Sequence, residues 1–282
     1  MLNQFNQTTV RALALDLDGT IINEGNLCPG VVDILARISD LGVEIILATG
    51  RPRRNLPHEL LAMPYLRYIV TLNGTCVSNC KNKQYISCLP LDYSSIKKLL
   101  HFTAEDARFA HLMCDDKVFI SPACEKKMRE CATHLWPEEM IGDIFQVVDS
   151  PIEYVQQHAI IINKLVLNCG NLAKSKVVLA KIAGHFNVES AIMENENVEL
   201  TAPGISKATG VELLCKHLGF SMHEVVAIGD SGNDALMLQA VGYSIAMGNA
   251  SDEIKSLAHM VAPCITENGA VHVLEQLFFN NR

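Results

Sequence analysis

Short apolar runs alternate with longer amphipathic segments along the first part of the chain. Apolar runs occupy residues 12–15, 43–48 and 68–72, and segments with helical spacing lie near 30–41 and 53–62. Continuous apolar runs of this length are typical of strands that are buried on both faces. Because helices separate these runs, the pattern predicts parallel strands joined by crossover helices, which is the α/β class.

The last part of the chain repeats this alternation. It predicts a helix at 207–218, a strand at 225–228, a helix at 233–241 and a strand at 243–246, followed by helices near 252–259 and 270–278. Residues between these two parts contain runs of both kinds without a chemical motif. Asn73-Gly74 and Lys81-Asn82-Lys83 predict turns near the entry to this middle stretch, and Pro203-Gly204 marks its exit. We therefore expect three segments, at 1–82, 83–199 and 200–282, of which the second is an inserted domain.

Composition narrows the classes of partner. The chain has 282 residues, of which 49% are hydrophobic and 19% charged, as in a globular protein with a large core. A net charge of −8 repels phosphate backbones, so we do not expect a nucleic acid partner. The N-terminal residues lack the pattern of an export signal, and the apolar runs are too short to span a membrane. Ten scattered cysteines without a C-x-x-C pair indicate reduced thiols, and together these features predict a cytoplasmic protein.

Two carboxylates directly follow the first predicted strand, in the run Asp16-Leu17-Asp18-Gly19-Thr20. Residues two apart in an extended chain point to the same side, and the carboxyl end of a parallel strand is where ligands bind. Like charges this close require a cation or a shared proton, so the pair indicates a metal site, acid–base chemistry, or both. An Asp-Gly turn that ends a strand is the alternative.

Two weaker signals lie at other element ends. Thr49 and Gly50 follow the predicted strand at 43–48, where a hydroxyl and a glycine amide can hold a phosphate. Lys207 begins a predicted helix, where it can neutralise a bound anion. The alternative for Thr49 and Gly50 is a turn before a helix that starts at Pro52. The alternative for Lys207 is an ordinary solvated lysine.

The fourth signal is the run Gly229-Asp230-Ser231-Gly232-Asn233-Asp234, which follows the strand at 225–228 and opens a helix. Two carboxylates, an amide and a hydroxyl within six residues provide the oxygen ligands that a hard cation such as Mg²⁺ prefers. A capped helix start is the alternative interpretation.

The four motifs in this order resemble those of the haloacid dehalogenase superfamily. The stretch from Gly204 to Ala250, with GISK, GDSGNDALM and AMGNA, is similar to the Cof-like sugar-phosphate phosphatases. The resemblance covers about 1–82 and 200–282, and it is architectural in the middle. It implies a Rossmann-like three-layer parallel-sheet core, at 1–82 and 200–282, and a smaller inserted α+β cap domain at 83–199.

The resemblance also implies roles for individual residues. Asp16 would be the nucleophile that forms an aspartyl-phosphate, and Asp18 would be the general acid and base. The phosphate-binding residues would be Leu17, Thr49, Gly50, Lys207 and Asn233. The Mg²⁺ site would comprise Asp16, the backbone carbonyl of Asp18, Asp230, Ser231 and Asp234. Ala208 stands where relatives often have glycine after the lysine, and a helical alanine is compatible with this assignment.

Spacing between the motifs sets the position of the cap. Thr49 follows Asp18 by 31 residues, which leaves no room for a domain, whereas Lys207 follows Thr49 by 158. In this superfamily an insertion after the second motif implies the larger α/β cap, which closes over the active site and selects the leaving group. His111, Met113, Cys114 and Asp115-Asp116 are candidate substrate contacts in the cap, although a strand followed by a turn explains them equally well.

These inferences favour a Mg²⁺-dependent phosphatase acting on small phosphomonoesters, among which sugar phosphates are the leading candidates. Two alternatives remain open at this point. One is a phosphomutase, because phosphomannomutases have a similar core and the same cap position. The other is a non-catalytic regulatory protein that retains the fold. The physiological substrate and the oligomeric state are not determined by the sequence.

Overall fold

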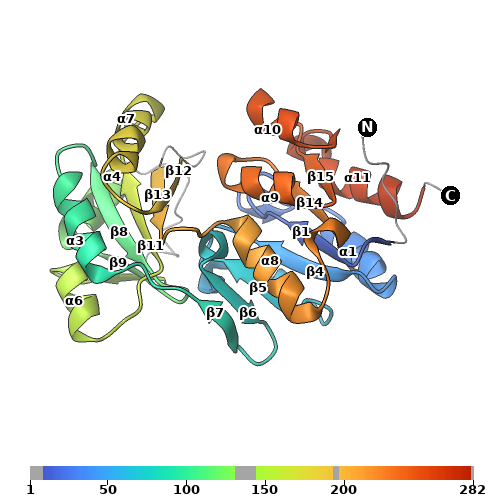
Figure 1. Cartoon of the computed structure of the whole chain (residues 1–282), viewed down its shortest axis with the longest axis horizontal. Helices are drawn as coiled ribbons and strands as arrows, with labels where there is room; N and C mark the ends of the chain where they lie inside the picture. The colour runs from blue at the N-terminus through green and yellow to red at the C-terminus, as the bar shows by residue number, and fades with distance from the viewer. Residues whose placement is uncertain (1–8, 131–143, 193–196, 281–282) are drawn as a thin grey trace. The chain divides into compact units, whose positions relative to one another are not determined.

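The computed structural model describes residues 9–130, 144–192 and 197–280 (Figure 1). The chain forms two compact units. The core unit comprises Met1–Gly50, Leu56–Ser87 and Ser206–Arg282, and the inserted unit comprises Arg51–Asn55 and Cys88–Ile205. Each unit has its own sheet and its own hydrophobic core.

An eight-stranded sheet forms the centre of the core unit, in the order β16-β15-β14-β1-β4-β5-β6-β7. Its strands are β1 (Ala12–Leu15), β4 (Glu44–Ala48), β5 (Tyr68–Thr71), β6 (Cys76–Asn79), β7 (Tyr85–Cys88), β14 (Val225–Gly229), β15 (Tyr243–Ala246) and β16 (Met260–Val261). The strands from β16 to β5 are parallel, and β6 is antiparallel to β5. Every residue of β1, β4 and β14 is buried, as expected for strands covered on both faces.

Helices cover both faces of this sheet (Figure 1). One face packs against α1 (Val31–Asp40), α2 (His58–Ala62) and α11 (Gly269–Phe278), and the other packs against α8 (Lys207–Leu218), α9 (Ala235–Ala240) and α10 (Asp252–Leu257). In β1 the leucines face α1 and α11, whereas the alanines face α8. The small residues on that side leave room for α8 to lie close to the strands. The predicted three-layer α/β core is confirmed.

The inserted unit has a six-stranded sheet in the order β10-β9-β8-β11-β13-β12, in which only β9 and β10 pair in parallel among the described residues. Its strands are β8 (Phe109–Met113), β9 (Val118–Ile120), β10 (Phe145–Val147), β11 (Lys164–Asn168), β12 (Glu189–Ile192) and β13 (Asn197–Thr201). Helices α3 (Tyr93–Phe102), α4 (Pro122–Glu130), α6 (Pro151–Gln157) and α7 (Leu172–Ala183) complete the unit. A mostly antiparallel sheet with separate helices is the predicted α+β arrangement.

The structure moves both junctions of the predicted inserted domain. The hairpin with its tip at 81–83 extends the core sheet, because β6 pairs with β5 and β7 pairs with β6. At the exit, β13 pairs with β11 and β12 in the sheet of the inserted unit. The inserted unit therefore ends at Ile205, beyond the predicted residue 199. The helix expected at 53–62 is also interrupted, since Pro57 separates a short 3₁₀ turn at Arg53–Asn55 from α2.

Three other expectations are tested within the described residues. Seven cysteines are free, but Cys76 and Cys88 are disulfide-bonded, so the expectation of reduced thiols throughout is wrong for these two residues. No described helix has both the length and the apolar character that crossing a membrane requires. His111 and Met113 lie in β8, and 114–116 form the turn that follows it, which agrees with the structural interpretation of that cluster.

We predict that Gly210→Ala destabilises the core unit. At an unhindered helical position, alanine would ordinarily gain about 1 kcal/mol over glycine. Here its Cβ would lie 2.6 Å from Val70 Cγ1 and 2.8 Å from the Cα of Gly74, so the helix would be pushed off the sheet. The expected result is a loss of about 1–3 kcal/mol in the free energy of unfolding, measured by urea denaturation. Gly184→Ala is the matched control, because its Cβ would meet only ordinary contacts. Equal effects of the two substitutions would contradict this account.

Candidate active site

The polar motifs meet at one edge of the core sheet. Strands β14, β1 and β4 are adjacent and parallel, so the residues that follow them emerge at the same edge. These residues are Asp230, Asp16 and Thr49. The carboxylates of Asp16, Asp230 and Asp234 each offer an oxygen within 4.8 Å of the others, and all three side chains are buried.

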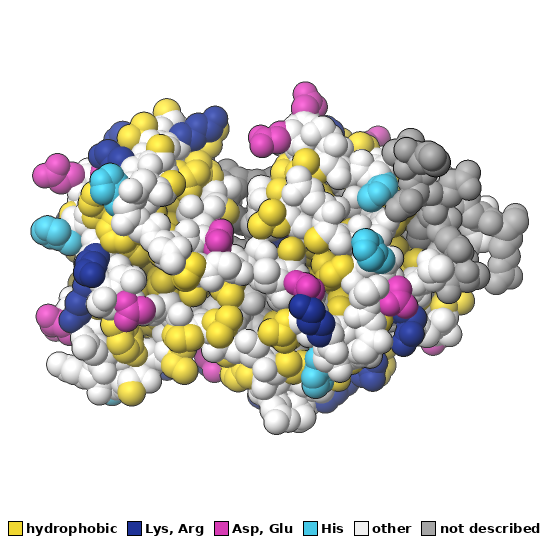
Figure 2. Space-filling view, in the orientation of Figure 1, with side chains coloured by type: hydrophobic (Ala, Val, Ile, Leu, Met, Phe, Trp, Pro, Cys, Tyr) yellow, Lys and Arg dark blue, Asp and Glu magenta, His cyan; other side chains and the backbone are white. Residues whose placement is uncertain are grey.

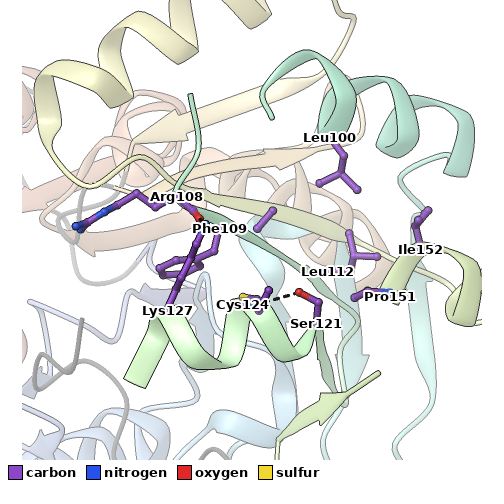
Figure 3. Close-up of a pocket in the computed structure, with 11 residues that line it drawn as sticks. Leu100, Arg108, Phe109, Leu112, Ser121, Cys124, Lys127, Pro151 and Ile152 are labelled. Carbon is purple, nitrogen blue, oxygen red and sulfur yellow. Dashed lines mark hydrogen bonds between the residues drawn. The ribbon is translucent and has the colours of Figure 1, made fainter. Parts of the chain in front are cut away.

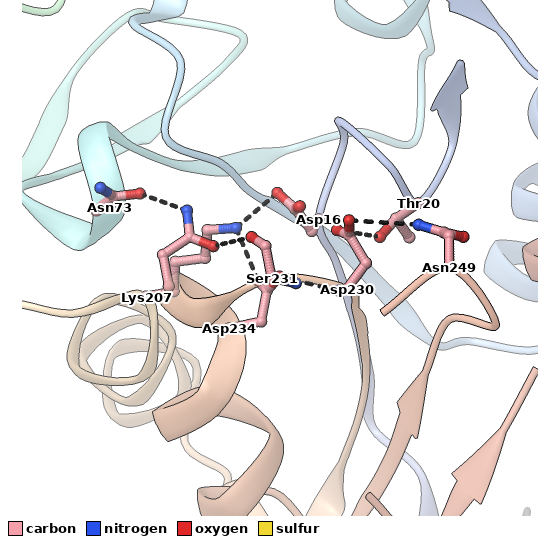
Figure 4. A network of polar contacts seen from close by, with 9 residues as sticks. Asp16, Thr20, Asn73, Lys207, Asp230, Ser231, Asp234 and Asn249 are labelled. Atoms are coloured by element: carbon pink, nitrogen blue, oxygen red, sulfur yellow. Dashed lines mark hydrogen bonds and ion pairs between the residues drawn. The ribbon is translucent and has the colours of Figure 1, made fainter. Parts of the chain in front are cut away.

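Lys207 joins two of these carboxylates. Its side chain is fully buried, and its Nζ lies 2.6 Å from Oδ1 of Asp16 and 2.7 Å from Oδ1 of Asp234 (Figure 4). Ser206 caps α8 by accepting from the Thr209 N–H, which fixes the first turn from which the lysine extends. The ion pairs therefore connect the end of β1, the start of α8 and the loop after β14.

Asp234 uses its second oxygen to shape the loop after β14. Its Oδ2 accepts from the backbone N–H groups of Asp230, at 3.0 Å, and Ser231, at 3.1 Å. Gly229 leaves the space that this requires, because a Cβ there would lie 2.6 Å from the Cβ of Asp234. Asp234 therefore acts as a positioning residue, for Lys207 through Oδ1 and for this loop through Oδ2.

Asp230 is held by two side chains to which sequence analysis gave no role. The Thr20 hydroxyl donates to Oδ1 at 3.3 Å, and Nδ2 of Asn249 lies 3.4 Å from Oδ2 (Figure 4). The same amide of Asn249 donates to the Gly19 carbonyl at 2.9 Å. Gly19 has a φ of 76°, and a Cβ at this position would overlap the Asp230 carboxylate. Thr20 lies in the motif DLDGT and Asn249 in the motif AMGNA. The sequence therefore singled out both motifs, but it did not indicate that these two side chains contact Asp230.

Asn73 links the second motif to the fourth. It has a left-handed backbone (φ 58°), and its N–H donates to the Thr49 carbonyl at 3.0 Å. Its side-chain oxygen accepts from Nδ2 of Asn233 at 3.0 Å, and Asn233 in turn accepts from the Ser231 hydroxyl at 2.7 Å. The sequence indicated only a turn at Asn73-Gly74. The structure thus places Asn233 and Ser231 near the carboxylates, with the Ser231 hydroxyl donating to Asn233.

Asp18 and Leu17 occupy a tight turn directly after β1. The Leu17 carbonyl accepts from the N–H groups of Thr20, Ile21 and Ile22, which closes the turn. Leu17 packs its side chain into the core, whereas Asp18 is exposed. Of the two aspartates, Asp16 is therefore buried and Asp18 is open to solvent. Gly50, which follows the buried Thr49, is half-buried.

The electrostatics of the site follow from the burial of these groups. Burial and the nearby Asp234 raise the pKa of Asp16 to about 7, and the Lys207 ammonium offsets only part of this rise. Burial disfavours the Lys207 ammonium, but Asp16 and Asp234 outweigh burial and raise its pKa. The cluster holds three buried carboxylates and one buried ammonium, which pairs with two of them, so negative charge is in excess. Excess negative charge on carboxylate oxygens fits a divalent cation held by Asp16 and Asp230.

Comparisons with known proteins agree with this geometry. Residues 13–274 match the family model of haloacid dehalogenase-like hydrolases. The chain is 28% identical over 262 residues to a pyridoxal phosphate phosphatase of Escherichia coli, covering 90% of this chain and 93% of that protein. A 5-amino-6-(5-phospho-D-ribitylamino)uracil phosphatase of Bacillus subtilis is 23% identical over 96% of this chain and 99% of its own length.

Solved structures show the same fold. A sugar phosphatase of haloacid dehalogenase subclass IIB superposes with a TM-score of 0.78 at 21% identity, covering 95% of this chain and 98% of that one. A phosphatase from Bacteroides thetaiotaomicron superposes with a TM-score of 0.76 at 26% identity, covering 95% of both chains. The architecture of both units is therefore shared with known phosphatases.

We predict that Asp16→Asn stabilises the metal-free protein. The folded state raises the pKa of Asp16 from 3.8 to about 7, so the free energy of unfolding falls as pH rises through this interval. Asparagine removes that penalty, and at pH 8 in EDTA the variant should be more stable by about 1–4 kcal/mol. The difference should shrink at pH 5, and we expect added Mg²⁺ to reduce it as well, by stabilising the wild type. A variant less stable than wild type at pH 8 in EDTA would contradict this prediction.

Lys207→Met has the opposite effect. It leaves Asp16 and Asp234 buried without their shared cation, which costs about 3–5 kcal/mol in the free energy of unfolding. The matched control is Lys216→Met on the same helix, whose exposed pair with Glu212 is worth less than about 1 kcal/mol. Thermal and urea unfolding of both variants provide the measurement. If the two variants were equally stable, the lysine would not hold the site together.

Proposed function

The chain belongs to the haloacid dehalogenase-like hydrolase family, and from this premise we propose that it is a Mg²⁺-dependent phosphatase that hydrolyses small phosphomonoesters through an aspartyl-phosphate on Asp16. The observation that carries this proposal is the pairing of Asp16 with Lys207 beside Asp230 at one edge of the sheet. A nucleophilic carboxylate needs its negative charge oriented and partly neutralised before it can approach a phosphate dianion. This arrangement supplies both.

In the first step an oxygen of Asp16 attacks the phosphorus atom and the bond from phosphorus to the leaving oxygen breaks. Asp18 donates a proton to that leaving oxygen, so an alcohol departs. Lys207 holds Asp16 in the orientation for attack and neutralises charge shared by the carboxylate and the phosphoryl group. The Thr49 hydroxyl, the backbone N–H groups of Leu17 and Gly50, and Asn233 are the proposed partners of the phosphoryl oxygens.

In the second step a water molecule attacks phosphorus and the bond to Asp16 breaks. Asp18, now a carboxylate, accepts the proton from that water, and inorganic phosphate forms as Asp16 is regenerated. The exposed position of Asp18, one residue beyond the buried Leu17, suits a group that must exchange protons with leaving group and water. Splitting one displacement into two avoids direct attack of a weak nucleophile such as water on the ester.

We propose that Asp16, Asp230 and the backbone carbonyl of Asp18 hold the Mg²⁺ ion, with Ser231 and Asp234 around them. The ion would supply Lewis-acid polarisation and charge neutralisation at the phosphoryl group. Thr20 and Asn249 orient Asp230 toward this position. Asp234 contributes through the loop and through Lys207, because both of its oxygens accept from those donors.

The proposed substrate is a small phosphorylated metabolite, and sugar phosphates are the leading candidates. Relatives are named for pyridoxal phosphate and for a phosphorylated ribityl compound, and a sugar phosphatase shares the fold. The net charge of −8 supports a small metabolite over a nucleic acid, and we propose a cytoplasmic setting for this reaction. That the inserted unit selects the leaving group stays a prediction.

We expect phosphate release from a panel of hexose and pentose phosphates, nucleotides and pyridoxal phosphate, in Mg²⁺ and not in EDTA. Asp16→Asn should lower kcat by about 10³-fold or more because it removes the nucleophile, and Asp18→Asn by about 10²- to 10⁴-fold. Lys216→Met, at the exposed end of α8, is the control that should retain wild-type turnover.

Two results would overturn this proposal. Formation of a positional isomer of the sugar phosphate, dependent on a bisphosphate activator, would indicate a phosphomutase. A folded protein that releases no phosphate from any member of the panel would indicate a non-catalytic role.

A further inference from the structure

The inserted unit contains a cavity to which the proposed reaction gives no role. Its volume is about 250 Å³, and it lies between helices α3, α4 and α6 and strand β8 (Figure 3). The lining residues are Leu100, Arg108, Phe109, Ala110, Leu112, Ser121, Ala123, Cys124, Lys127, Pro151 and Ile152. All of them belong to the inserted unit, whereas Asp16, Lys207 and Asp230 belong to the core unit.

The cavity has a charged end and an apolar end. Lys127 and Arg108 lie at one end, and Leu100, Pro151 and Ile152 lie toward the other (Figure 3). The Arg108 guanidinium extends past Gly170, away from the other lining side chains. Between them the Ser121 hydroxyl accepts from the Cys124 N–H at 3.1 Å, which leaves its own O–H to donate. The cavity can therefore take a ligand with an apolar body and one polar end.

The charge at the polar end is positive. Among the described residues no carboxylate lines the cavity or pairs with the side chains of Arg108 and Lys127. Carboxylates nearby in the sequence are engaged elsewhere, since Glu125 pairs with Arg129 and Asp106 with Lys181. Lys127 donates to the Arg108 carbonyl, which holds its ammonium beside the cavity and leaves two further N–H groups for a ligand.

We propose that this cavity is a binding site for a small amphipathic carboxylate, separate from the phosphoryl-transfer site. The Lys127 ammonium can donate to a carboxylate at this end, and the exposed Arg108 side chain adds a second cation nearby. A cavity of about 150 Å³ lined by apolar side chains holds one benzene ring. The larger volume here therefore accommodates a single aromatic ring with a short acidic side chain.

The choice of a carboxylate over a phosphate ester follows from the lining. Most of the lining side chains are apolar, and the charged groups are confined to one end. A sugar phosphate would bury its hydroxyl groups against Leu100, Leu112 and Ile152 without hydrogen-bond partners, which is unfavourable. An arylalkyl carboxylate buries only apolar surface at that end and keeps its charge beside the two cations.

The test uses 3-phenylpropanoate as the probe and 3-phenylpropanamide as its uncharged counterpart, titrated into the full chain in EDTA by calorimetry. No phosphate ester is present, so the result does not depend on the proposed phosphatase activity. We expect the carboxylate to bind with a Kd of about 1 mM or tighter, and the amide at least about tenfold more weakly.

Variants locate the binding to this cavity. Arg108→Gln combined with Lys127→Gln should weaken 3-phenylpropanoate binding about tenfold. Lys126→Gln is the matched control, because this exposed lysine of the same helix does not line the cavity, and it should change the Kd less than about twofold. Ala110→Leu should fill the apolar part and abolish binding of both probes, while circular dichroism shows a folded protein.

Three outcomes would overturn the proposal. These are equal affinity for the carboxylate and the amide, unchanged binding to the Arg108→Gln, Lys127→Gln double variant, and no binding of either probe to the folded wild type at about 10 mM. The double variant replaces exposed side chains, so retention of the wild-type melting temperature in both glutamine variants separates a loss of the site from a loss of the fold.

Discussion

The ammonium of Lys207 between Asp16 and Asp234 is the interaction on which the rest of the site depends. It joins three segments that lie far apart in the chain, and each of its partners is buried. Removing charges from water is unfavourable unless they are paired, so this lysine is what allows the carboxylates to stand at the edge of the sheet. One ammonium does not balance Asp16, Asp230 and Asp234 together. The remaining negative charge favours a divalent cation, while burial, with the nearby Asp234, raises the pKa of Asp16.

The fold brings Lys207 within reach by letting α8 approach the sheet closely. The strand face beneath this helix carries alanines, including Ala12, Ala14 and Ala48. Gly210 of α8 lies against Gly74, and Gly74 lies against the Ser206 carbonyl at the start of the helix. Side chains at either glycine would push the first turn of α8 away, and with it the lysine. Small residues in the packing thus determine an ion-pair distance in the site.

The sequence was informative about residues that follow strands and less so about what connects them. Asp16, Thr49 and Asp230 were each placed at a strand end, and the family resemblance implied that they share one site; in the structure adjacent parallel strands bring them to a common edge. No role was given to Asn73, Thr20 and Asn249. Their hydrogen-bond partners, Asn233 for the first and Asp230 for the other two, lie 160, 210 and 19 residues away in the chain. Only the order of the strands in the sheet shows that these residues meet. The boundary at the hairpin was misplaced for a related reason: β7 joins the core sheet through pairing, which composition does not reveal. Pro57, in contrast, was a visible signal that the helix at 53–62 would break.

The central claim is that Asp16 becomes covalently phosphorylated in a site whose charge is balanced by Lys207 and a divalent cation. A single turnover in Mg²⁺, quenched in acid and treated with borohydride, tests it most directly, because reduction converts an aspartyl-phosphate to homoserine at the modified position. Peptide mapping by mass spectrometry should then locate homoserine at residue 16, and only in samples that contained Mg²⁺. Homoserine at residue 18 or 230, or phosphate release without any modified aspartate, would contradict the account.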